Sequence, residues 1–274
     1  MDIPDKKLDH IIDLTSRAAD AAQQDIENDE IDVDELPSTL NGLGKYFRKQ
    51  GQCYALLGNS EQAREGYTQA AQYKWESVQA MRDHREELPP NLWEDAPAIY
   101  ADGMLFALIG RDEDLVHDIA AEAIELDESY LETFGESAGS QLRYYNAKLL
   151  AATILDDDRW EDLLSGYIEA VGQIVPTEIR EQKHVASDLR ARLYGALYNR
   201  EGELFASVFE KYLRGYAANT PLDTDDPEEL LNDELTALCL LANDRGINVT
   251  IDSPFVPDVL VPDPSEAIHV VEVH

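Results

Sequence analysis

The feature that most constrains this fold is an apolar pattern that repeats about every 3.6 residues along most of the chain. That spacing places apolar side chains on one face of a helix, so it predicts amphipathic α-helices. Glycines, prolines and acidic stretches interrupt the pattern and predict turns. The predicted helices cover about 8–22, 38–57, 60–84, 97–109, 112–126, 141–155, 159–173, 178–199, 203–218 and 227–244. The chain lacks the β–α alternation that would build a parallel sheet.

The end of the chain reads differently from the rest. Residues 247–274 combine prolines with β-branched runs, which predicts an extended segment or a small strand pair. We therefore divide the chain into three parts. These are an N-terminal helix and acidic loop at 1–35, a helical-repeat domain at 36–246, and an extended C-terminal tail at 247–274.

The second and third predicted helices carry a spaced set of small and aromatic residues. The members are Phe47, Gly51, Tyr54, Gly58, Ala63, Tyr67 and Ala70. This set resembles a tetratricopeptide unit, in which two antiparallel helices form a hairpin. The resemblance implies that Gly51 allows a close helix approach, that Gly58 forms the turn, and that Ala63 lies where the helices cross.

The same spacing returns further along the chain. A second unit consists of Gly103, Phe106, Gly110, Leu115 and Ile119, and looser echoes follow at 163–170 and 205–212. Two departures are visible: Trp75 replaces the usual proline of the first unit, and the intervals exceed the regular repeat of about 34 residues. We predict an all-α fold, a right-handed stack of antiparallel tetratricopeptide-like hairpins, with a short extended or β C-terminal tail.

Acidic residues outnumber basic ones by 56 to 22, which gives a formal net charge of −34. The acids are spread over the whole sequence, so they form a uniform coat rather than a tail. Such a chain repels phosphate groups, which argues against nucleic-acid and anionic-membrane partners. We interpret the coat as an adaptation to a high-salt, halophilic cytoplasm, where charge repulsion is screened.

Two further observations favour an intracellular, cytoplasmic protein. The N-terminus lacks the apolar core of a signal peptide, and the longest apolar runs are far shorter than a membrane span. The two cysteines, Cys53 and Cys239, lie inside apolar helical patterns and predict buried thiols rather than a disulfide.

One string has a catalytic form. Residues 135–139 read GESAG, which fits the G-x-S-x-G pattern of serine hydrolases with Ser137 as the nucleophile. That chemistry needs a strand before the serine, and the preceding ELDESYLETF does not read as one. We favour a capping role for this stretch, with Ser140 before a helix that begins near Gln141, and we assign no catalytic residue. The serine hydrolase remains the alternative function.

Metal and cofactor patterns are weak. Glu113 and His117 are four residues apart, but acids are so frequent that chance adjacency explains the pair. The stretch 223–234 has some acids of a calcium loop, yet Glu228 stands where the loop requires glycine. Asp226 and the proline after it are better explained as a helix start. We predict no metal, no cofactor and no enzymatic activity.

The C-terminal stretch LNDELTALCLLANDRGINVTIDSPFVPDVLV carries a recognisable pattern. Its matching residues are Leu235, Leu238, Leu240, Leu241, Ala242, Gly246, Val249, Ile251, Val256, Pro257, Leu260 and Val261. The segment resembles the closing part of the immunity protein 49 family of polymorphic-toxin systems. The resemblance implies a non-enzymatic protein that binds a cognate toxin and neutralises it. A generic scaffold for peptides or subunits is a further alternative.

Tetratricopeptide hairpins line an inner groove with residues of their first helices, and the repeat register indicates which ones. The residues placed there are Lys45, Arg48, Tyr100, Tyr145, Lys148, Arg190 and Tyr194. They predict a locally basic groove that binds a protein partner, such as an acidic segment, through charge-assisted hydrogen bonds. The alternative is that these cations pair with neighbouring acids, each exposed pair contributing about 0–1 kcal/mol.

Overall fold

A computed structural model describes residues 3–174, 186–220, 224–261 and 269–273. Its first helices are α1 (Asp5–Glu27), α2 (Leu36–Leu56), α3 (Ser60–Asp83), α4 (Pro90–Trp93), α5 (Ala96–Gly110), α6 (Glu113–Ile124), α7 (Ser129–Phe134), α8 (Ala138–Leu155) and α9 (Trp160–Ile174). The chain continues with α11 (Ala186–Tyr198), α12 (Gly202–Asn219), α13 (Pro227–Leu230), α14 (Asp233–Asp244), β1 (Val249–Asp252) and β2 (His269–Glu272). The predicted all-α class with a short β element near the C-terminus is confirmed.

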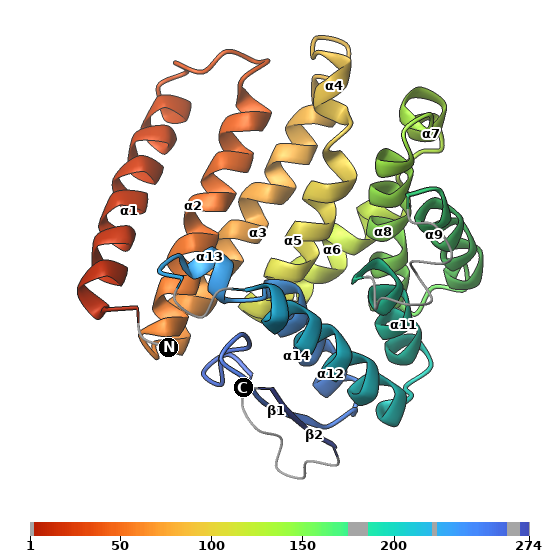
Figure 1. Ribbon diagram of the computed structural model, residues 1–274. Helices are drawn as coiled ribbons and strands as arrows, with labels where there is room; N and C mark the ends of the chain where they lie inside the picture. The colour runs from red at the N-terminus through yellow and green to blue at the C-terminus, as the bar shows by residue number, and fades with distance from the viewer. Residues whose placement is uncertain (1–2, 175–185, 221–223, 262–268, 274) are drawn as a thin grey trace.

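Helices that follow one another along the chain pack side by side. The contacts run from α1 to α2, α3, α5, α6, α8 and α9 in turn, and α11 packs on α12 (Figure 1). This order is the one expected from short connections between amphipathic helices. The right-handed sense of the stack stays a prediction.

The first repeat unit packs as its glycines require. A Cβ atom added at Gly51 would lie 2.9 Å from the Tyr67 ring and 3.0 Å from the Ala63 carbonyl oxygen. The backbones of α2 and α3 therefore cross with room for hydrogen only, and the predicted crossing at Ala63 is confirmed. The second unit repeats the arrangement more loosely, because a Cβ atom at Gly103 would lie 3.4 Å from Ile119.

Each of four turns between paired helices has one residue in the left-handed backbone conformation, and in one of these turns that residue is a glycine. Gly58 has φ +76°, as its place in the repeat predicts. The equivalent positions later in the chain are Arg111, Asp156 and Arg200, with φ between 53° and 64°. Gly110 is instead the last residue of α5, where a Cβ atom would lie 2.9 Å from the backbone nitrogen of Thr68. That glycine permits close packing on α3 rather than a turn.

Several predicted boundaries were wrong. The helix expected at 227–244 is divided into α13 and α14, because the Asn232 side chain caps a new helix by accepting from the Leu235 backbone N–H at 2.9 Å. The helix α7 lies in a stretch for which no helix was predicted, and α8 begins at Ala138 rather than near Gln141. Of the helix expected at 178–199, the part before residue 186 lies outside the described residues.

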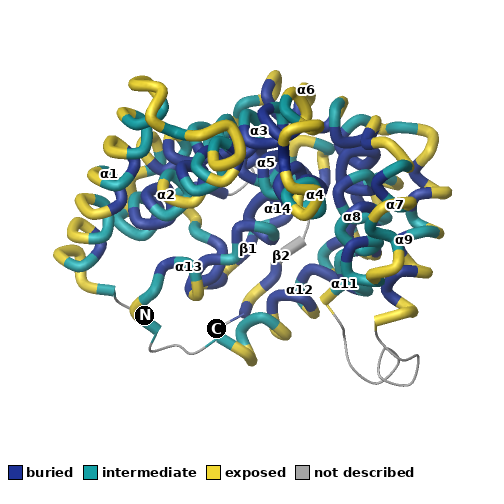
Figure 2. The backbone as a smooth tube through the Cα atoms, turned by 90° about the horizontal axis from the view of Figure 1, so that it is seen from above, coloured by how far each residue is buried: buried dark blue, intermediate teal, exposed yellow. Residues whose placement is uncertain are grey.

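The last helix, α14, lies at the centre of the molecule. Its residues from Leu235 to Ala242 are all buried, so it has no solvent-facing stripe. Figure 2 shows the row from α1 to α9 curving around one side, with α12, α13, α14 and the strands filling the inner side. Strands β1 and β2 pair in parallel, with Val249 opposite His269, and β2 packs on α12. No helix in the described part of the chain is long and apolar enough to cross a bilayer.

Candidate binding cavity

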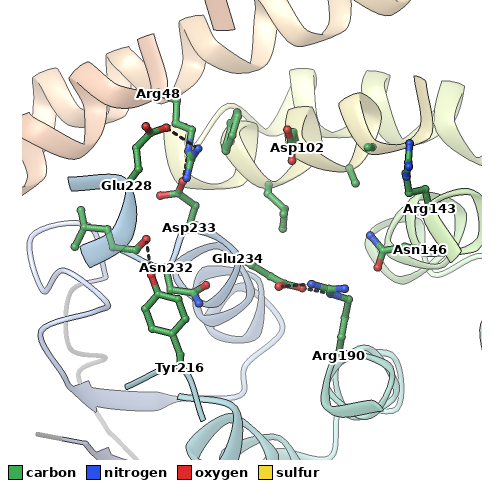
Figure 3. A pocket seen from close by; sticks show the side chains of 15 residues that line it. Arg48, Asp102, Arg143, Asn146, Arg190, Tyr216, Glu228, Asn232, Asp233 and Glu234 are labelled. Atoms are coloured by element: carbon green, nitrogen blue, oxygen red, sulfur yellow. Dashed lines mark hydrogen bonds and ion pairs between the residues drawn. The ribbon is translucent and has the colours of Figure 1, made fainter. Parts of the chain in front are cut away.

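A cavity of about 380 Å³ lies between the helical row and the segment that fills its inner side. Helix α5 supplies its apolar wall, α8 and α11 supply polar side chains, and the start of α14 closes the opposite side (Figure 3). Its charged lining residues are Arg48, Asp102, Arg143, Arg190, Glu228, Asp233 and Glu234. The wall of the cavity thus contains four acids and three arginines.

Arg48 of α2 holds the start of α14. Its Nε donates to Asp233 at 2.5 Å, and a terminal nitrogen donates to Glu228 at 3.1 Å. Asp233 is 7% exposed and also accepts from Gln52, at 3.0 Å, and from the Tyr67 hydroxyl, at 2.5 Å. A carboxylate buried to this degree needs such partners, because an unpaired buried charge is strongly destabilising.

The protonation states at this contact follow from burial and charge. Burial alone would lower the pKa of Arg48, but the Asp233 carboxylate raises it above its ordinary value. Burial and the same carboxylate raise the pKa of Tyr67 well above its ordinary value. Arg48 therefore stays charged and Tyr67 stays a neutral donor. The nearby Cys53 thiol has its pKa raised to about 12 by burial, so it stays protonated.

Arg190 of α11 makes a similar contact with Glu234, the residue after Asp233 in α14. Its guanidinium forms an ion pair with Glu234 that includes a hydrogen bond of 2.7 Å, and the Tyr212 hydroxyl donates to the same carboxylate at 2.7 Å. Burial raises the pKa of Glu234, but Arg190 and Tyr212 outweigh it and leave the pKa below its ordinary value. The start of α14 is thus fixed by arginines from two distant helices.

The other end of α14 is fixed as well. Arg111 donates to both carboxylate oxygens of Asp244 at 2.8 Å. Arg245 forms an ion pair with Asp156 at 2.7 Å and donates to the Leu197 carbonyl oxygen at 2.9 Å. These partners lie at or near the turns of three successive helical pairs. The helix α14 is therefore held along its length by the row that surrounds it.

Of the seven residues predicted to share one groove, the structure brings Arg48 and Arg190 to the same cavity. Both are already paired with the chain's own acids, as the alternative prediction had it. Tyr194 is fully buried beside the cavity, with its hydroxyl 3.5 Å from Asn146 Oδ1. Lys45 is exposed and does not line the cavity.

The remaining three predicted residues point elsewhere, so the single trough is wrong. Tyr100 is 2% exposed and bonds Arg82 on the side of α3 and α6. Lys148 donates to the Leu126 carbonyl oxygen at 2.8 Å, and the Tyr145 ring packs against Gly166 of α9. The predicted register was two residues out of phase with the observed one. Two residues of helix correspond to about 200° of rotation, so side chains predicted to face the groove lie on the other side of their helix.

The correct register places other residues at the cavity. Helix α8 contributes Arg143 and Asn146, which are three residues apart and share a face. Helix α5 contributes a similarly spaced set: Ala98, Ala101, Asp102, Leu105 and Phe106. This spacing on the predicted helix 97–109 is visible in the sequence. The acids at the start of α14 gave no such signal, because the whole chain is acidic.

Ser137 is the N-terminal cap of helix α8. It follows helix α7 and caps α8, where its hydroxyl oxygen accepts from the Ser140 backbone N–H at 3.4 Å. A nucleophile elbow requires a preceding strand and a strained backbone, whereas Ser137 has an ordinary extended conformation with φ −88°. The capping interpretation of this stretch is confirmed, although Ser137 rather than Ser140 is the cap. Ser140 instead donates to Glu94 at 2.6 Å.

The other weak motifs are equally accounted for by local contacts. Asp226 caps α13 by accepting from the Glu228 backbone N–H at 3.1 Å, and Glu228 pairs with Arg48 and Lys49. Within the described ranges no three His, Cys, Asp or Glu side chains gather in a way that would hold a metal ion.

A scan against family models, a search among curated proteins and a search among solved structures each found no match. The fold and the cavity define an all-α protein whose curved helical row encloses its own C-terminal helix.

Proposed function

We propose that this chain is a non-catalytic helical-repeat protein that binds a partner protein at the cavity beside α14. One observation carries the proposal: the helical row already holds a helix on its inner side, through the pairs Arg48–Asp233 and Arg190–Glu234. The cavity continues that surface, with half-exposed Arg143 and Asn146 at the same level of the row (Figure 3). A surface that binds one helix in cis has the shape and chemistry to bind a segment in trans.

The narrower proposal is that the partner is a toxin and that the chain neutralises it. It rests on the resemblance of the C-terminal segment to the immunity protein 49 family. The residues that carry the resemblance, such as Leu235, Leu238 and Val249, are fully buried in the core. They support a shared fold rather than a shared binding site, so the toxin's identity is left to experiment.

The test is a protection assay in a salt-tolerant host. Each open reading frame next to this gene is expressed alone and together with this chain, and growth is recorded. We expect one product that arrests growth alone and not in coexpression, and that co-elutes with this chain. Arg143→Glu should abolish protection at unchanged protein level, whereas Arg17→Glu on α1, which removes the exposed pair with Asp13, should preserve it. If no neighbouring product is both toxic and neutralised, the toxin-binding proposal is wrong.

A further inference from the structure

One basic side chain of the cavity lining, Arg143, is readily available to a ligand. Each acid of the lining is held by a cation of the chain: Asp233 and Glu228 by Arg48, Glu234 by Arg190, and Asp102 by the buried Lys74 at 2.8 Å. Among the described residues Arg143 pairs only with Asp95, at 2.7 Å, and the two side chains are 41% and 67% exposed. An exposed pair of this kind contributes little, so Arg143 can exchange its partner at small cost.

Arg143 and Asn146 present hydrogen-bond donors on one face of α8. The guanidinium has five N–H groups, and one of its nitrogens faces Asp95. Asn146 lies one turn further along α8, and its oxygen faces the Tyr194 hydroxyl. Among the described residues its NH₂ group makes no hydrogen bond. The surplus of donors favours a ligand with anionic oxygens.

The charge of the wall limits how much negative charge the ligand can carry. Four carboxylates line the cavity, and they repel a dianionic group such as a phosphate more strongly than a monoanion. The apolar wall of α5, with Ala98, Ala101 and Leu105, is suited to the methylene stem of a side chain. A glutamate side chain has both properties.

We propose that Arg143 and Asn146 form a carboxylate-binding site that receives a glutamate side chain from an acidic helical segment of the partner. The chain's own α14 presents Asp233 and Glu234 to Arg48 and Arg190 in the same way, and the partner's glutamate extends that row of contacts. This inference rests on the proposed function, since it names the chemistry by which the partner is recognised.

The test uses two defined probes. One is an N-acetylated, amidated helical peptide of alanine and leucine with glutamates four residues apart, and the other has glutamine at those positions. Binding is measured by calorimetry and by the side-chain amide signals of the asparagines in an NMR spectrum, in a buffer of high KCl concentration. We expect the glutamate peptide to bind about tenfold or more tightly than the glutamine peptide, as lost charge-assisted hydrogen bonds require. The side-chain amide signals of Asn146 should shift.

Two variants make the test specific. Arg143→Gln should remove the preference for glutamate, and Asn146→Asp should weaken glutamate binding by like-charge repulsion. Arg17→Gln, which removes an exposed arginine elsewhere, should change nothing. Thermal melting shows that each variant is folded. Equal affinity for the two peptides, no binding of either, or a preference that survives Arg143→Gln would each overturn the carboxylate site. The protection assay tests the proposed function separately. If a toxic partner is neutralised equally well by the wild type and by Arg143→Gln, the proposed function is supported and only the carboxylate site is wrong.

Discussion

Gly51 and Gly42 lie on the same helix, α2, but a methyl group would meet very different surroundings at the two positions. At Gly51 the added carbon would lie 2.9 Å from the Tyr67 ring and 3.0 Å from the Ala63 carbonyl oxygen, and at Gly42 nothing lies within 4 Å. We expect Gly51→Ala to lower the free energy of unfolding by about 1–3 kcal/mol through overpacking. Gly42→Ala should raise it by about 0.5–1 kcal/mol, because alanine favours the helix. Urea unfolding at constant KCl measures both, and equal effects would contradict the close crossing.

Glu234 links stability to pH at the residue scale. Its pKa in the folded protein is lowered by Arg190 and Tyr212 despite burial, so the folded state prefers the ionised form. The resulting stabilisation is fully present above the unfolded-state pKa of about 4.3 and is lost as the pH falls through the folded-state pKa. We expect the difference in unfolding free energy between the wild type and Glu234→Gln to shrink as the pH is lowered from 6 to 3. A difference that stays constant over this range would show that Glu234 is not ionised in the fold.

At the scale of elements, Arg245 joins α14 to the ends of two other helices. It is 7% exposed and donates to the carbonyl oxygens of Thr153 in α8 and Leu197 in α11, which lie in the last turns of their helices. We expect Arg245→Ala to destabilise the protein by about 3 kcal/mol, since it removes the charge-assisted hydrogen bonds to both carbonyl oxygens and the ion pair with Asp156. Arg200→Ala is the matched control, because Arg200 pairs with the same Asp156 but is 62% exposed, and it should cost about 0–1 kcal/mol. Similar losses in thermal unfolding would contradict the anchoring role.

Elements were more predictable from the sequence than the site. Apolar spacing located most helices, and the glycine pattern predicted the crossing of α2 and α3, because both depend on residues close in sequence. Phase within a helix was less certain: reading α8 two residues out of register selected Lys148 instead of Asn146 for the cavity. The ion pairs of Arg48 with Asp233 and of Arg190 with Glu234 join residues 185 and 44 positions apart. In a chain with 56 acids nothing in the sequence singles out those two carboxylates.

The whole molecule places its charges in two different environments, and salt should affect them differently. The acidic coat gives a net charge of −34 and repels itself over a Debye length of about 10 Å at 0.1 M salt, which shortens to about 3 Å at 1 M. The pair between Arg48 and Asp233 is inside the protein, where salt screens little. We therefore expect the melting temperature to rise steeply with KCl between 0.1 M and 2 M. Asp233→Asn should lower the melting temperature at every KCl concentration while leaving the slope unchanged, because that variant alters an internal contact and not the coat. A melting temperature independent of KCl would refute the high-salt interpretation of the coat. If the lower melting temperature of Asp233→Asn returned to the wild-type value at 2 M KCl, the pair of Arg48 and Asp233 would be exposed to solvent.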